Sequence, residues 1–339
     1  MLLKKRLSNN SFIPRKTKKR VLVKTKHLDF GFNILDGRIV AIISKTVFVE
    51  SADGVMFEAI VKGVIVTSNQ SSSLIAVGDY VKIEPKVGRI GDSGLPLCTI
   101  LEILERTTIL SRKSSGYEPF EQIIASNITD VVVMVAAVNP QYNLKLIDRI
   151  IISGQLNGLS PSIIVNKIDL INISEIESDF EVYKNLGYNI FFVSVEKQIG
   201  INEFIDFLTN KEVSLIGQSG VGKSSLINLL FGEEVQKTKE VSQYSTKGRH
   251  TTSYVKMFDY KKQFKIVDSP GIREYAIWGL DKQDLTFYFK DFYPFAEQCK
   301  YPHCSHLHEP GCRVVEAIEE GLINPIRYES YCNIYDSLE

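Results

Sequence analysis

The stretch GQSGVGKS, residues 217–224, decides the fold because it fits the pattern Gly-x-x-x-x-Gly-Lys-Ser/Thr. It follows the apolar run 213–216 and precedes the helical run 225–231, so it lies between an expected strand and an expected helix. Glycines there let successive backbone N–H groups turn toward phosphate oxygens, and the helix N-terminus adds partial positive charge. A glycine-rich turn without a ligand does not require both flanks. We therefore expect a phosphate-binding loop whose nucleotide contacts are Gly217, Gln218, Ser219, Gly220, Val221, Gly222, Lys223, Ser224 and Ser225.

Further motifs are expected to serve the Mg²⁺ ion and the γ-phosphate. Lys223 would reach the β- and γ-phosphates, and Ser224 would bind Mg²⁺. Asp268-Ser269-Pro270-Gly271 ends the apolar run 264–267 and matches Asp-x-x-Gly, in which Asp268 supports Mg²⁺ and the N–H of Gly271 senses the γ-phosphate. The pair Thr251-Thr252 lies where a switch threonine belongs, with Thr252 as the second Mg²⁺ ligand.

A base-reading motif follows the apolar run 162–165. In Asn-Lys-x-Asp, the aspartate accepts from the N1–H and the exocyclic amine of guanine, whereas adenine offers the wrong edge. Two charge-assisted bonds of about 1.5–3 kcal/mol each would favour guanine by about 10²-fold or more. The lysine would cover the base plane and the asparagine would hold the loops together. Alone the tetrapeptide also fits a polar turn, but beside a phosphate loop it indicates a guanine nucleotide. The expected base site comprises Asn166, Lys167, Ile168 and Asp169, with Ser194 and Val195 after the run 190–193.

The order of these motifs predicts a circularly permuted GTPase. Small GTPases place the base-reading motif last, but here it precedes the phosphate loop by about 50 residues. A permuted chain can build the same pocket because domain termini usually lie at the surface. Residues 117–285 are assigned to this α/β domain, since continuous apolar runs alternate there with helical stretches, as in a parallel sheet wrapped by helices. The predicted strands are 130–138, 162–165, 190–193, 213–216 and 264–267.

Residues 35–112 are expected to form a small barrel of the OB type. Many such barrels bind nucleic acid and many are only structural, so the pattern does not choose between the two. Residues 112–116 (RKSSG) are expected to be a linker to the GTPase domain. The predicted barrel strands are 38–44, 45–50, 57–61, 80–84 and 99–104.

Residues 286–339 are assigned to a helical zinc module. Three thiolates and one imidazole would close a tetrahedral shell with no open position, which is typical of structural Zn²⁺. His303 and His308 are alternative imidazole donors, and reduced cysteines beside surface histidines are the alternative to a metal site. Helices are expected over 313–323 and from 325 through 335, while Cys98 and Cys332 are expected to be core residues. The predicted ligands are Cys299, Cys304, His306 and Cys312.

The 339 residues have a net charge of zero, but the basic and acidic side chains are distributed unevenly along the chain. Residues 1–26 hold ten basic side chains and no acidic one, so the flexible tail 1–34 is expected to meet a polyanion. A solvated tail without a partner, or an organelle transit peptide, are the alternatives. No run of 18 apolar residues is present, so we expect no membrane span and a cytoplasmic protein.

The combination of an OB-like barrel, a permuted P-loop GTPase domain and a Cys/His helical module resembles the RsgA (YjeQ) family of GTPases that depend on the small ribosomal subunit. The resemblance covers residues 35–335. The motifs that carry it are Val77-Gly78-Asp79, 146–149, 166–169, 217–225, Gly248-Arg249-His250-Thr251-Thr252, 268–271 and Glu309-Pro310-Gly311-Cys312.

The resemblance implies a late factor in assembly of the small ribosomal subunit. Such a factor binds the immature particle through its barrel and zinc module, hydrolyses GTP to GDP and phosphate in response, and leaves. The implied cofactors are one structural Zn²⁺ and Mg²⁺ with GTP. The implied partners are the small subunit and its rRNA, without a membrane, for a protein that we expect to be a monomer.

The residue that would place the attacking water is not a glutamine here, because Ile272 follows Asp-x-x-Gly and isoleucine cannot hydrogen-bond water. Intrinsic hydrolysis should therefore be slow. The resemblance implies that His250 takes this role, and the alternative is a surface residue of the switch.

Three other functions fit parts of the sequence. A GTP-dependent rRNA-binding switch with incidental hydrolysis would show turnover that the small subunit does not raise. A P-loop ATPase or kinase would bind ATP more strongly than GTP. An RNA-binding adaptor whose nucleotide pocket is inactive would bind neither GTP nor ATP.

Overall fold

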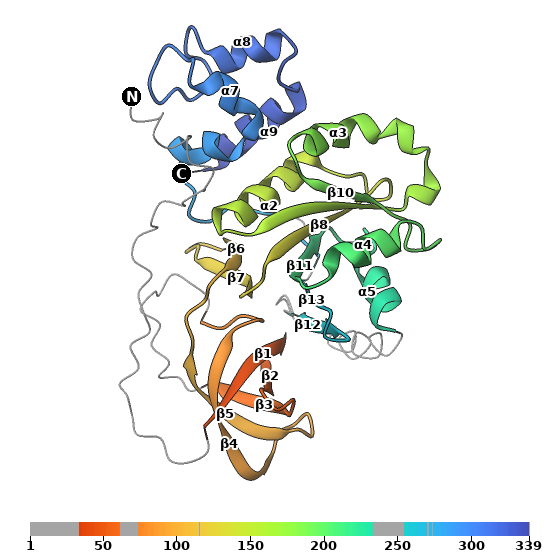
Figure 1. The fold of residues 1–339 in the computed structure, drawn as a ribbon. Coiled ribbons are helices and arrows are strands. Elements are labelled where there is room, and N and C mark those ends of the chain that lie inside the picture. Colours follow the sequence, from red (N-terminus) through yellow and green to blue (C-terminus); the bar gives the residue numbers. More distant parts are fainter. Residues whose placement is uncertain are drawn as a thin grey trace.

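The structure, a computed structural model, describes residues 34–61, 74–114, 116–232, 254–269, 271–272 and 274–338. Figure 1 shows three regions in a row: a barrel, a central sheet flanked by helices, and a helical module beyond them. No helix in these described ranges is long and apolar enough to cross a membrane.

The first region is a closed five-stranded barrel. Neighbouring strands pair in the order β1-β2-β3-β5-β4, and β4 pairs again with β1 to close the sheet. Every pairing is antiparallel except that of β3 with β5, and this topology confirms the predicted OB-like barrel. Inward-facing residues such as Ile39, Ile83 and Ile100 are fully buried, as is Cys98. The strands are β1 Leu35–Ile43, β2 Thr46–Ser51, β3 Met56–Val61, β4 Tyr80–Ile90 and β5 Pro96–Ile103.

The second region is an α/β layer whose strands run in the order β10-β9-β8-β11-β13. These five strands are parallel, and β12 adds an antiparallel neighbour to β13. Alternate residues of β8 face opposite sides of the sheet: Val133 packs with the helices α2 and α3, and Val132 packs with α4 and α5. The strands are β8 Asp130–Ala136, β9 Ser160–Asn166, β10 Asn189–Phe192, β11 Glu212–Gly217, β12 Tyr254–Tyr260 and β13 Phe264–Asp268. The helices are α2 Leu144–Leu156, η1 Ile168–Leu170, η2 Ile173–Glu175, α3 Glu177–Asn185, α4 Ile201–Leu208 and α5 Lys223–Phe231.

The expected linker at 112–116 is wrong at its start. Arg112 and Lys113 belong to the strand β6 Ile109–Lys113, which forms an antiparallel hairpin with β7 Glu121–Ser126. The polar residues at 112–116 did not indicate a strand, because the buried residues of β6, Ile109 to Ser111, lie before them in the sequence. This hairpin lies between the barrel and α2 (Figure 1).

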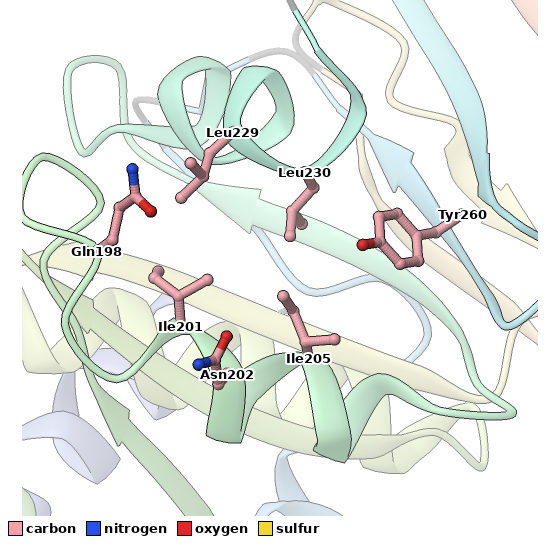
Figure 2. Close-up of a pocket in the computed structure, with 7 residues that line it drawn as sticks. All are labelled: Gln198, Ile201, Asn202, Ile205, Leu229, Leu230 and Tyr260. Carbon is pink, nitrogen blue, oxygen red and sulfur yellow. The ribbon is translucent and has the colours of Figure 1, made fainter.

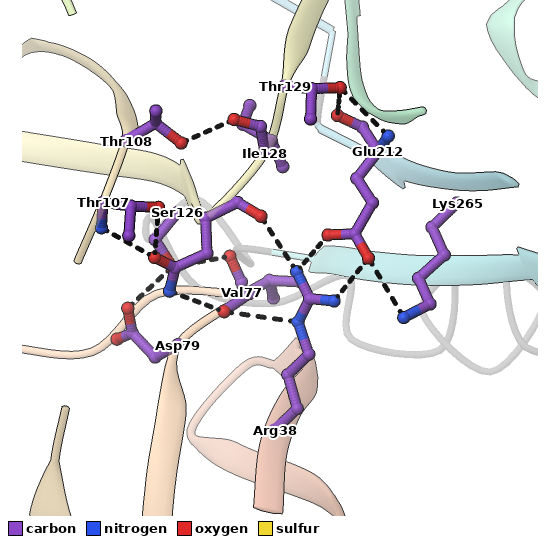
Figure 3. A network of polar contacts seen from close by, with 12 residues as sticks. Arg38, Val77, Asp79, Thr107, Thr108, Ser126, Ile128, Thr129, Glu212 and Lys265 are labelled. Atoms are coloured by element: carbon purple, nitrogen blue, oxygen red, sulfur yellow. Dashed lines mark hydrogen bonds and ion pairs between the residues drawn. The ribbon is translucent and has the colours of Figure 1, made fainter. Parts of the chain in front are cut away.

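The barrel and the α/β layer share one sheet, because β1 pairs with β12. A polar network reinforces this joint (Figure 3). The guanidinium of Arg38 donates to both carboxylate oxygens of Glu212, at 2.8 and 2.5 Å, and to the carbonyl of Asn127 at 3.0 Å. Lys265 on β13 donates to the same carboxylate at 3.1 Å.

The third region packs its last helix against α2. Arg327 of this helix is buried and pairs with Asp148 of α2 and with Asp291. The first C-terminal helix ends at Glu319, short of the predicted 323, and Gly321 follows in the left-handed region with φ +73°. The elements are η3 Lys282–Tyr288, η4 Lys290–Phe292, α7 Tyr293–Ala296, α8 Arg313–Glu319 and α9 Pro325–Ser337.

Candidate nucleotide site and metal centre

The phosphate loop joins β11 to α5 as the sequence predicts. Two of its glycines have no room for a side chain: a Cβ on Gly217 would lie 2.1 Å from the carbonyl oxygen of Met134, and one on Gly222 would lie 2.2 Å from Nδ2 of Asn166. Gly222 also has φ +104°, a conformation that favours glycine. The N-cap residue of α5 is Gly222, which makes no side-chain cap hydrogen bond, and the partial positive charge of this helix N-terminus favours an anion.

The lysine of the loop lies within it. Lys223 is buried, and its Nζ donates to the carbonyls of Gly217 at 2.6 Å and Gln218 at 3.0 Å. Ser224 is exposed at the first turn of α5. The ammonium therefore sits beside the backbone that would surround a phosphate.

Asn166 connects the phosphate loop to the second base loop. Its Nδ2 donates to the carbonyl of Val221 at 2.9 Å, and its Oδ1 accepts from the N–H of Val195 at 3.0 Å. Asp169 accepts from the hydroxyl of Ser194 at 2.5 Å. The side chains predicted to read the base thus lie together with the phosphate loop, although about 50 residues separate them in sequence.

The Asp-x-x-Gly segment also reaches the phosphate loop. Asp268 ends β13, and a Cβ on Gly271 would lie 3.0 Å from the backbone nitrogen of Ser219. The N–H of Ile272 donates to the carbonyl of Gly217 at 3.2 Å. The expected catalytic His250 and the switch residues Thr251 and Thr252 lie outside the described residues.

The sequence did not indicate one neighbour of this site, the turn after β8. Lys167 donates through Nζ to the carbonyl of Asn139, and Pro140 lies 3.7 Å from a Cβ built on Gly220. The available signal was the position of Asn139-Pro140 at the carboxyl end of a central parallel strand, the edge where such sheets bind ligands.

The GTPase layer also contains a cavity of about 220 Å³ (Figure 2). It is framed by side chains from α4, α5 and β12, including Ile205, Leu230 and Tyr260. None of the predicted nucleotide residues lines it. No lysine, arginine or phosphate-loop residue among those described lines it, so it offers no charge to hold a triphosphate and is not the nucleotide site.

The four predicted metal ligands converge in the C-terminal module. The donor atoms of Cys299, Cys304, His306 and Cys312 all lie within 4.8 Å of one another. The Sγ atoms of Cys299 and Cys312 are 3.9 Å apart, and Nδ1 of His306 lies 3.5 and 3.4 Å from them. A tetrahedral zinc shell requires about 3.8 Å between sulfurs and about 3.6 Å between nitrogen and sulfur. The residues therefore fit a zinc ion.

Neighbouring groups hold the loop that carries the imidazole. The carboxylate of Glu309 accepts from the N–H of Ser305 at 2.8 Å, and from two further backbone N–H groups. Tyr328 and Tyr331 of α9 donate to the carbonyls of His306 and Ser305. Burial lowers the pKa of His306, which favours the neutral imidazole that a metal requires. His303 and His308 are exposed and lie outside the cluster, so the structure selects His306 among the three candidates.

The model of the RsgA GTPase family matches residues 103–278, more than half of the chain. The small ribosomal subunit biogenesis GTPase RsgA of Chlorobaculum parvum is 38% identical over 309 residues, which cover 90% of this chain and 98% of the relative. The protein of the same name from Klebsiella pneumoniae is 33% identical and covers 95% of this chain and 90% of its own. The chain belongs to the RsgA GTPase family. It is therefore a GTP hydrolase.

Solved structures agree with the RsgA assignment. YjeQ from Thermotoga maritima aligns over 90% of this chain and 98% of its own, with a TM-score of 0.64 and 28% identity. YloQ, described as a circularly permuted GTPase, aligns over 92% of this chain and 97% of its own, with a TM-score of 0.62 and 25% identity. The permutation predicted from motif order is confirmed, as is the three-part fold.

Proposed function

We propose that this RsgA-family GTPase acts in late assembly of the small ribosomal subunit. It binds the immature particle, hydrolyses GTP to GDP and phosphate in response, and dissociates as a monomer in the cytoplasm. The names of its relatives support the subunit as partner, and rRNA is the polyanion that the basic residues of the tail 1–34 would meet.

One observation carries the nucleotide part of this proposal. Asn166 joins the phosphate loop to the loop of Ser194 and Val195, so the base-reading and phosphate-binding elements share one site. Asp169 would accept from guanine, Lys223 would contact the β- and γ-phosphates, and Gly271 would sense the γ-phosphate through its N–H. Mg²⁺ would be held by Ser224 and Thr252, with support from Asp268. The other predicted contacts are Lys167, Ile168, Gln218, Ser219, Gly220, Val221, Ser225 and Thr251.

The zinc ion would have a structural role, because four protein donors leave no open coordination position. His250 would orient the attacking water. Ile272 cannot do so, since its side chain is apolar and only 5% exposed.

The test is GTP hydrolysis with and without purified small subunits, with ATP and large subunits as controls. We expect slow turnover that only GTP and the small subunit raise strongly. His250→Ala should abolish the stimulation and leave GTP affinity intact, whereas the matched His308→Ala should change neither. Turnover that subunits do not raise would leave a guanine-nucleotide switch whose partner is different, and loss of GTP affinity in His250→Ala would remove His250 from catalysis.

A second experiment tests whether Asp169 recognises the guanine base. Asp169→Asn should lose GTP affinity by about 10²-fold, because an amide cannot accept from both guanine donors. The same variant should gain affinity for xanthosine triphosphate, whose C2 carbonyl accepts where guanine donates. Unchanged GTP affinity would show that Asp169 does not read the base.

A further inference from the structure

The segment that follows Asp-x-x-Gly is held by a buried tyrosine hydroxyl. Tyr275 is 3% exposed, and its hydroxyl donates to the carbonyl of Ser111 on β6, at 2.7 Å. The same oxygen lies 2.8 Å from the hydroxyl of Ser153 on α2. Ser153 in turn donates to the carbonyl of Ser111 at 2.9 Å. Both serines are 1% exposed, so this triangle of oxygens is closed to solvent.

The triangle fixes one end of a short segment whose other end touches the phosphate loop. The N–H of Ile272 donates to the carbonyl of Gly217, and the carbonyl of Ala276 accepts from the N–H of Lys113 at 2.9 Å. Tyr275 lies three residues beyond Ile272. Gly271, which directly precedes this anchored segment, lies beside Ser219 of the phosphate loop.

The same triangle joins the segment after Gly271 to two elements that border the other regions. Ser111 belongs to the hairpin next to the barrel. Ser153 belongs to α2, and α2 holds α9 of the C-terminal module through Asp148 and through Arg149, which donates to the carbonyl of Asn333 at 3.0 Å. The hydroxyl of Tyr275 thus connects the segment after Gly271 to the hairpin and to the helix on which α9 packs.

A hydroxyl at this depth is not needed for packing. A phenylalanine would fill the same space, and a buried hydroxyl without partners is unfavourable, so its two partners indicate a specific placement. Ile272 stands where many GTPases carry a water-placing glutamine, so this residue can contribute to hydrolysis only through its main chain.

We propose that Tyr275 is a positioning residue for GTP hydrolysis, which holds the main chain after Asp-x-x-Gly in its reactive place against the hairpin and α2. The proposal rests on the proposed function, because it assumes that Gly271 faces the γ-phosphate. It predicts a role in the rate of the chemical step and none in nucleotide binding.

The experiment compares Tyr275→Phe with the wild type, with kcat, KM and GTP affinity measured in the absence and presence of saturating small subunits. We expect kcat to fall by about tenfold or more in both conditions with KM and GTP affinity unchanged, since small misplacements of reacting groups lower rates steeply. Tyr142→Phe is the matched control, because it removes a hydroxyl that donates to Asp179 at 2.6 Å in the same domain. That variant should retain the wild-type kcat.

A second variant separates positioning from loss of stability. Ser153→Ala removes one corner of the triangle and should lower kcat less, because Tyr275 still donates to Ser111; added to Tyr275→Phe it should cause little further loss. Equal kcat in Tyr275→Phe and the wild type would overturn the proposal, as would a parallel loss of GTP affinity. A wild type that subunits do not stimulate would instead overturn the proposed function, while the comparison of kcat values without subunits still decides the role of Tyr275.

Discussion

The barrel and the C-terminal module are attached to the GTPase layer by different means. The barrel continues the sheet through β1 and β12, so its joint consists of main-chain hydrogen bonds supported by Arg38. The C-terminal module packs α9 on α2, and its central polar contact is Arg327 between Asp148 and Asp291. Backbone pairing over three residues of each strand does not depend on any one side chain, whereas loss of a buried cation leaves two carboxylates without compensation.

The two joints also differ in their distance from the nucleotide. Glu212, which receives Arg38, is the first residue of β11, and the phosphate loop begins at the other end of that strand. By contrast, α2 contacts the segment after Gly271 through Ser153. The joint between β1 and β12 thus adjoins the end of β11 that is remote from the phosphate loop, whereas the helix that holds the C-terminal module also contacts the segment after Gly271. Four predictions test this difference.

Removal of the metal should have the largest effect, and only on the C-terminal module. Cys312→Ser opens a shell whose zinc affinity contributes on the order of 10 kcal/mol to folding in small zinc domains. We expect loss of bound zinc and rapid proteolysis beyond residue 286, with the barrel and GTPase layer intact. Metal content and limited proteolysis measure this. Cys332→Ser is the control, since that thiol lies on α9 outside the cluster and should leave zinc bound. A Cys312→Ser protein that keeps one zinc ion and its protease resistance would contradict the assignment.

Arg327→Met should cause the second largest loss of stability. It leaves Asp148 and Asp291 without their cation in a buried place, where breaking such a pair costs about 3–5 kcal/mol. The fluorescence of Trp278, the single tryptophan of the chain, measures unfolding. Arg313→Met is the control, because its pair with Glu320 is exposed and screened by solvent, so its loss should change stability far less. Similar losses for the two variants would mean that the C-terminal joint does not depend on its buried cation.

Local sequence explains why the motifs and most strands were predictable. The phosphate loop needs glycines within eight residues, and a strand buried on both faces shows as an apolar run such as 130–138. The pairing of β1 with β12 joins residues more than 200 positions apart, and no local pattern encodes it. Asn139 and Tyr275 were missed for the same reason, because their partners come from distant segments. The choice of His306 over His303 and His308 depended on burial, which spacing alone does not show.

At the barrel side, Gly78→Ala should be the most harmful single change. Gly78 has φ +101°, and a Cβ there would lie 2.0 Å from the carbonyl oxygen of Ser126 on β7, so the barrel would have to separate from the hairpin. We expect a loss of about 2–3 kcal/mol in the free energy of unfolding by urea. Gly54→Ala is matched, with φ +84° and open space around its Cβ, and should cost about 1 kcal/mol. Equal losses of unfolding free energy in the two variants would show that the structure adjusts to a Cβ at Gly78 without cost.

The smallest effect should come from the ion pair of Arg38 and Glu212, and it should depend on pH. Burial alone would raise the pKa of Glu212, but the hydrogen bonds and charges of Arg38 and Lys265 outweigh it and leave that pKa below its ordinary value of 4.5. A carboxylate with a lowered pKa stabilises the fold fully above 4.5, and this contribution is lost as the pH falls through the lower folded value. A double-mutant cycle of Arg38→Met and Glu212→Gln should therefore give a coupling energy of about 1.5–3 kcal/mol at pH 7 that decreases below pH 4.5. Lys82→Met with Asp36→Asn, an exposed pair in the same barrel, should give less than about 1 kcal/mol at pH 7. A coupling energy for Arg38 and Glu212 no larger than that of this exposed pair would mean that main-chain pairing alone holds the barrel. The two joints would then differ most, because only the C-terminal one would depend on a buried ion pair.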